Sequence, residues 1–134
     1  MSFREKSAWV MGVIMLATGG WYAQLVAAAP QAPVIGPLIP YVLAVIVLSI
    51  VAQVILAILS PKEADAPADE REKIAIDRAG NWSGVILGFG VITAIVMYIG
   101  GWTPTMLVHA IVGALIISTI AEYVFQIVLF RRAS

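Results

Sequence analysis

Hydrophobic and charged residues occupy separate parts of this chain. Two long runs, residues 7–61 and 79–130, contain a single Asp, Glu, Lys or Arg between them, which is Glu122. The other charged residues fall in three short segments, 4–6, 62–78 and 131–132. A helix needs about 20 apolar residues to cross the hydrocarbon core of a bilayer, so each run is long enough for two crossings. The pattern predicts an all-α integral membrane protein with four transmembrane helices.

Proline and glycine divide each run into two spans. In the first run, the prolines and glycine between residues 30 and 40 suit a turn followed by the first residues of a new helix. In the second run, Gly100 and Gly101 favour a turn, Thr103 can cap the next helix, and Pro104 fits its first position. The four predicted spans are residues 8–28, 41–59, 82–99 and 106–130.

The basic residues predict the orientation of these spans. Cytoplasmic loops of membrane proteins carry an excess of Lys and Arg. With four spans, all eight Lys and Arg residues fall on one side, before span one, in the loop 60–81, or after span four. We therefore expect two helical hairpins with the N and C termini and this loop in the cytoplasm. Residues 1–134 form a single integral membrane domain in this interpretation.

Composition narrows the possible functions. The chain is 61% hydrophobic and 12% charged, whereas soluble domains average about 25% charged residues. It has no cysteine, which excludes disulfides, thiolate metal sites and cysteine nucleophiles. No phosphate-binding loop, dinucleotide fingerprint or catalytic constellation is present. We expect a non-enzymatic protein with no cofactor and no bound metal, whose partners are the lipid bilayer and other membrane subunits rather than nucleic acid.

The loop contains a second predicted helix, over residues 69–79. Asp69 lies four residues before Lys73, an arrangement that supports a helix. Arg71, Lys73 and Arg78 can reach lipid phosphates from it. Two interpretations are open: a solvated extension of span three, or a cytoplasmic docking surface. The residues of that surface are Asp69, Glu70, Arg71, Lys73 and Arg78.

Small residues predict how spans three and four pack, because transmembrane helices associate where small side chains let backbones approach. Gly80, Gly84 and Gly88 repeat every four residues and form a glycine zipper on one face, while Gly90 and Ala94 form a second small row. Span four offers a matching stripe of small and polar residues, which comprises Ala110, Ala114, Ser118, Glu122 and Gln126.

Glu122 is the main candidate for a functional residue inside the membrane. It lies nine residues before Arg131, or about 13 Å along the helix, where an isolated charge is expensive. One interpretation is a carboxyl that binds and releases a proton or cation. The other is a neutral acid held by Ser118, Gln126 and Gln53 that joins the helices. We include Gln53 because the two halves of the chain are weakly alike: residues 49–53 of span two (Ser-Ile-Val-Ala-Gln) match residues 118–122 of span four (Ser-Thr-Ile-Ala-Glu), which aligns Gln53 with Glu122.

His109 is the only histidine, about one turn from the outer end of span four. A single histidine is a poor metal site, because closed sites need three or four ligands. It can sense external pH or hydrogen-bond near the interface, where amphipathic rings are stable. We expect the hydrogen bond.

The segment Asp69-Glu70-Arg71 before span three, together with the basic pair Arg131-Arg132 after span four, resembles a family of small bacterial four-helix membrane proteins of unknown function. The resemblance covers mainly residues 69–132 and implies a bacterial inner (plasma) membrane. We expect a regulatory or accessory subunit, or a homo-oligomer, that acts through helix and loop contacts. The alternative is a small dimeric proton- or cation-coupled transporter that uses Glu122.

Overall fold

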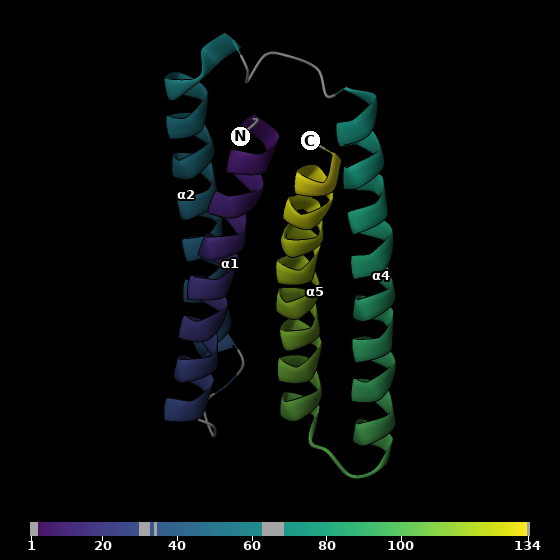
Figure 1. Ribbon diagram of the computed structural model, residues 1–134. Coiled ribbons are helices and arrows are strands. Elements are labelled where there is room, and N and C mark those ends of the chain that lie inside the picture. Colours follow the sequence, from purple (N-terminus) through teal and green to yellow (C-terminus); the bar gives the residue numbers. More distant parts are fainter. Residues whose placement is uncertain (1–2, 30–32, 34, 63–68, 134) are drawn as a thin grey trace.

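The chain folds into long helices that lie side by side (Figure 1). A computed structural model describes residues 3–29, 33, 35–62 and 69–133. Within these ranges the long helices are α1 (Phe3–Ala28), α2 (Ile35–Leu59), α4 (Glu70–Ile99) and α5 (Pro104–Ala133). Each of the four is long and apolar enough to cross a membrane, which confirms the prediction of an all-helical protein with four candidate spans.

The helices are arranged in the order α2, α1, α5, α4. Extensive contacts among the described residues join α4 to α5, α5 to α1, and α1 to α2. Both chain termini lie at one end of the molecule, at the top of Figure 1. We call this the charged end, because Arg4, Glu72 and Arg131 form ion pairs there. The opposite end, where α1 ends, α2 begins and residues 99–104 connect α4 to α5, is the uncharged end.

Helix α4 begins well before the predicted span three. Asp69 caps it: its carboxylate accepts a hydrogen bond from the backbone N–H of Glu72 at 2.8 Å, and its backbone is extended. From this cap the helix runs without interruption to Ile99, and Gly100 ends it. The predicted loop helix and span three are therefore one element of 30 residues, about 45 Å long at 1.5 Å per residue.

The turn after α4 follows the sequence prediction. Gly101 has a φ of +122°, a backbone conformation that glycine adopts without the cost of a side chain. The Thr103 hydroxyl accepts a hydrogen bond from the backbone N–H of Met106 at 3.2 Å, and Pro104 is the first residue of α5.

Helix α2, in contrast, begins at Ile35 rather than at residue 41, with Pro37 and Pro40 inside its first turns. Proline is tolerated in the first turn, where Pro37 lies and backbone donors have no helical partner, whereas Pro40 lies inside the helix and removes one backbone donor there.

The interface between α4 and α5 uses a different small row from the one we expected. A Cβ added to Gly90 would lie 2.8 Å from the Cβ of Ala114, so the two helices touch there almost backbone to backbone. On α4 the buried residues are Ala75, Ala79, Ser83 and Ala94. Gly84 and Gly88 are exposed, and nothing lies within 4 Å of a Cβ added to either. Their predicted packing against span four is wrong within this chain, and of the three zipper glycines only Gly80 lies near α5.

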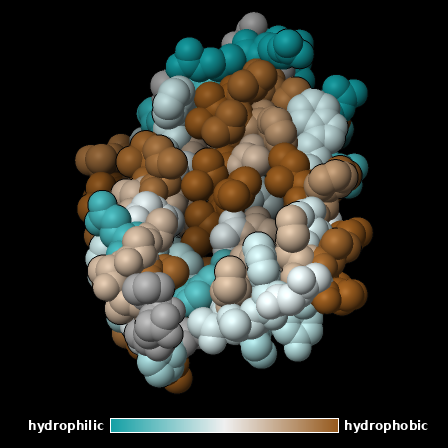
Figure 2. All heavy atoms as spheres, turned by 90° about the horizontal axis from the view of Figure 1, so that it is seen from below, coloured by the Kyte–Doolittle hydropathy of each residue, from teal (hydrophilic) through white to brown (hydrophobic). Residues whose placement is uncertain are grey.

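Two small clusters of buried residues connect the helices. At the charged end, Ala8 of α1, Ala75 of α4 and Phe130 of α5 pack together. Nearer the uncharged end, Tyr22 of α1, Tyr41 of α2 and Ile116 of α5 do the same. Seen from the uncharged end, hydrophobic side chains in brown lie across much of the view, and the largest hydrophilic group, in teal, lies along one edge (Figure 2). Large hydrophobic side chains along the helices, such as Leu43, Ile58 and Phe89, are exposed, and a bilayer can solvate them.

Candidate functional site

Glu122 lies on α5 where that helix passes α4. Its side chain is half-buried, and its Oε1 atom is 4.0 Å from the position that a Cβ on Gly80 would take. Gly80 therefore provides space beside the carboxyl. Among the described residues, the Glu122 carboxyl takes part in no hydrogen bond and no ion pair. An isolated charge inside a membrane is expensive, so a charged carboxyl in this position would need a partner from outside the described residues.

Among the described residues, none of the polar residues expected around Glu122 forms a hydrogen bond with it. Ser118 is buried, and its hydroxyl donates to the backbone carbonyl of Leu115 in its own helix at 3.0 Å. Gln53 lies on α2, and its Nε2 donates to the Ser7 hydroxyl of α1 at 2.9 Å. Gln126 is half-buried on α5 and forms no hydrogen bond with a described residue. The structure thus leaves Glu122 without the hydrogen bonds by which a neutral acid would join the helices.

His109 belongs to a separate cluster toward the uncharged end. Its Nδ1 is hydrogen-bonded to the Tyr22 hydroxyl of α1 at 2.6 Å, which confirms the expected hydrogen bond. The two rings have centroids 5.8 Å apart, and the Tyr41 ring of α2 lies 5.2 Å from that of Tyr22. His109 therefore joins α5 to α1, and through Tyr22 to α2. No group of three His, Asp or Glu side chains in the described ranges could hold a metal ion.

Glu5 is a buried acid that the sequence analysis missed. It is only 7% exposed, and its Oε1 lies 3.8 Å from the Arg131 Nε of α5. The Arg131 guanidinium also lies over the Trp9 ring, 5.7 Å from its centroid. The one available signal was spacing, because Glu5 and Ala8 are three residues apart and share a helix face.

The charged end also connects α1 to α4. Arg4 pairs with Glu72 of α4, with 3.3 Å between Nε and Oε2. The residues predicted as a docking surface lie around this contact and are all exposed: Asp69, Glu70, Arg71, Lys73 and Arg78. The helix that carries them is nevertheless packed on its other face, where Ala75 and Ala79 are buried. This part of α4 is therefore exposed on one face and packed on the other.

No protein-family model matches this chain, and searches of curated proteins and of solved structures find no similar one.

Proposed function

We propose that this chain is a non-enzymatic subunit, regulatory or accessory, of a larger assembly in the bacterial inner membrane. It lies there as two hairpins, α1–α2 and α4–α5, with both termini and the loop between α2 and α4 in the cytoplasm. The position of all eight Lys and Arg residues at the termini or in that loop supports this orientation. The resemblance of residues 69–132 to a bacterial family supports the setting.

The observation that carries the proposal is the exposed glycine pair on α4. Gly84 and Gly88 are separated by one helical turn, and neither has any atom within 4 Å of an added Cβ. Close approach of helix backbones is the main use of such a pair in a membrane. Within this chain α5 uses another face of α4, so the pair is available to a helix of a further subunit.

The neighbouring side chains give this face a shape that a helix can fit. Val85 and Phe89 are 70% and 76% exposed, and they follow Gly84 and Gly88 directly in the sequence. Large side chains therefore form a ridge beside the groove that the glycines leave. Ridges of one helix pack into grooves of another. A second copy of this chain or another membrane protein would bury this face.

The absence of cysteine makes the proposal directly testable. In a Val85→Cys variant, a photo-crosslinker attached to the single thiol should join this chain to a neighbouring subunit in native membranes. Adding Gly84→Leu and Gly88→Leu should abolish the product, because leucines fill the groove. Co-purification without crosslinker, followed by mass spectrometry, identifies the partner.

Gly20 supplies the matched control. It is an exposed glycine on α1, and a Cβ there also meets nothing within 4 Å. A Gly20→Leu change should leave the crosslink from position 85 intact. A chain that purifies alone as a monomer and gives no product at position 85 would contradict the proposal, as would equal loss of product in both leucine variants.

A second candidate function is a dimeric proton- or cation-coupled transporter, favoured by the half-buried Glu122 carboxyl, which has no hydrogen-bond or ion-pair partner among the described residues. In reconstituted vesicles, Glu122→Gln should then abolish proton-coupled flux, while a subunit that acts by contact keeps its partners after this change. Gln126→Ala, on the same face of α5, is the control and should keep the flux. If the protein purifies without any other subunit and transports protons, the second proposal holds and the first is wrong.

A further inference from the structure

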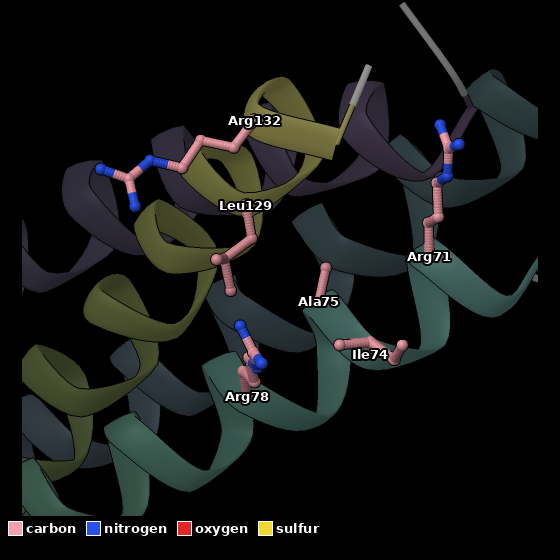
Figure 3. Close-up of a pocket in the computed structure, with 6 residues that line it drawn as sticks. All are labelled: Arg71, Ile74, Ala75, Arg78, Leu129 and Arg132. Atoms are coloured by element: carbon pink, nitrogen blue, oxygen red, sulfur yellow. The ribbon is translucent and has the colours of Figure 1, made fainter.

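A groove at the charged end is formed jointly by α4 and α5. It encloses about 280 Å³ and is lined by Arg71, Ile74, Ala75 and Arg78 of α4 and by Leu129 and Arg132 of α5 (Figure 3). The α4 residues are spaced at i, i+3, i+4 and i+7, so they share one face of that helix. Figure 3 shows Arg71 and Arg78 on either side of Ala75, with Leu129 directed toward Arg78 from α5. Three arginines therefore line a groove whose other residues are apolar, and of the three guanidinium groups that of Arg78 lies nearest to Leu129 in Figure 3.

The charge of this groove is of one sign. Among the described residues its lining contains three arginines and no acid. Glu5 and Glu72 form ion pairs with Arg131 and Arg4, which lie outside the lining. Arg71 has an interaction of its own, whereas Arg78 and Arg132 are exposed and form no ion pair with a described residue. Arg78 and Arg132 are therefore suited to an anion that the described residues do not supply.

The position of the groove indicates which anion. Arg78 lies just before the uncharged part of α4, and Arg132 lies just after the uncharged part of α5. Both guanidinium groups thus sit at the border of the segments that cross the membrane, where phospholipid phosphates lie. Arginine binds phosphate through paired N–H donors. Ile74, Ala75 and Leu129 offer the carbon surface that the glycerol and the start of an acyl chain require.

We propose that this groove binds an anionic phospholipid of the surrounding leaflet, held by its phosphate between Arg78 and Arg132 and by its apolar part against Ile74 and Leu129. Basic pockets between transmembrane helices are known to bind such head groups. The site needs only that the charged end lies at a membrane surface, so it does not depend on the proposed subunit role.

The test compares lipid retention by four forms of the purified protein in mixed micelles of phosphatidylglycerol and phosphatidylcholine with identical acyl chains. Native mass spectrometry counts the bound lipids. The wild type should prefer phosphatidylglycerol by about thirtyfold, the size of effect that two well-placed cations give. Arg78→Gln with Arg132→Gln should reduce this preference to near equality. Arg78→Lys with Arg132→Lys should retain part of it, because charge remains but the paired donors are lost.

Lys62→Gln with Lys73→Gln is the matched control. Both lysines are exposed and outside the groove lining, so this variant loses the same charge and should keep the preference. Melting temperatures in lipid-free detergent show whether each variant is folded. If the Arg→Gln variant is not folded, the Arg→Lys variant takes its place in the comparison. The site would be refuted if the Arg→Gln variant kept the wild-type preference for phosphatidylglycerol. It would also be refuted if the Lys→Gln control lost as much of that preference as the Arg→Gln variant. Displacement of the lipid by glycerol phosphate, or by an acidic peptide, at equimolar concentration would assign the groove to a soluble anion or a protein segment instead.

Discussion

Helices α2 and α5 differ in how they relate to the rest of the molecule. Over its most apolar window α2 has a mean hydropathy of 3.1, yet no residue of that window is buried. The corresponding value for α5 is 2.0, and α5 lies between α1 and α4 with contacts to both. The more hydrophobic helix is thus the peripheral one.

This difference illustrates what holds helices together in lipid. Acyl chains solvate aliphatic side chains as well as other helices do, so hydrophobicity provides no force for association. α5 associates through small and polar residues, with Ala114 against Gly90 and His109 against Tyr22. Even α2 is joined to α1 by residues of this kind, Tyr41 toward one end and Gln53 toward the other.

The largest expected effect comes from Gly90→Ala. The new Cβ would lie 2.8 Å from the Cβ of Ala114, which has no flexible end that could move away. The two helices must separate, and we expect a loss of about 1–3 kcal/mol in unfolding free energy, as for overpacked cores. The measurement is denaturant unfolding in detergent, followed by circular dichroism.

Gly84→Ala is the control for this change, because it is a glycine of the same helix with nothing within 4 Å of the new Cβ. It should be neutral or stabilising by up to about 1 kcal/mol through helix propensity. Adding Ala114→Gly to Gly90→Ala should restore much of the loss. A destabilisation of equal size at both glycines would mean that contact with α5 is not the cause.

An intermediate effect is expected for Tyr22→Phe, which removes the hydrogen bond to His109 and keeps the ring. Side-chain hydrogen bonds between transmembrane helices contribute about 0.6–2 kcal/mol, so unfolding should become easier by that amount. Tyr98→Phe provides the comparison, because Tyr98 is 41% exposed and has no side-chain hydrogen bond to a described residue. If both changes cost the same, the bond between α1 and α5 contributes nothing measurable.

The smallest effect is expected on α2. Gln53→Leu removes the hydrogen bond to Ser7 and should cost about 0.6 kcal/mol or less. Ser49→Ala removes a hydroxyl whose oxygen is buried and has no hydrogen-bond partner among the described residues, so it should leave stability unchanged or raise it by up to about 1 kcal/mol. Unfolding in the same detergent measures both. A loss on α2 as large as that for Gly90→Ala would reverse the ranking of the two helices.

Much of the secondary structure could be predicted from local chemistry. The charge-free runs indicate the spans, and Thr103 with Pro104 indicates the start of α5, because a cap and a first-turn proline act within a few residues. The spacing between Asp69 and Lys73 predicted a helix in this segment. The carboxylate of Asp69 also caps α4, where it accepts from the backbone N–H of Glu72. Such features need no knowledge of the rest of the chain.

The face on which α4 packs could not be predicted, because the helix offers two rows of small residues and is apolar nearly all round. Gly84 and Gly90 were equivalent candidates in the sequence, and the position of Ala114 decides between them. The burial of Glu5 was also out of reach. It depends on α4 and α5 arriving beside α1, through Ala75 and Phe130, which lie far from Glu5 in sequence.

The continuity of α4 has a structural consequence. From Glu70 to Ile99 it is one helix, about 45 Å long, while the hydrocarbon core of a bilayer is about 30 Å thick. In the proposed orientation about a third of it would extend beyond that core, and no proline interrupts it. A ligand bound at its first turn, near Arg71, and a subunit packed at Gly84 and Gly88 would then contact the same continuous helix.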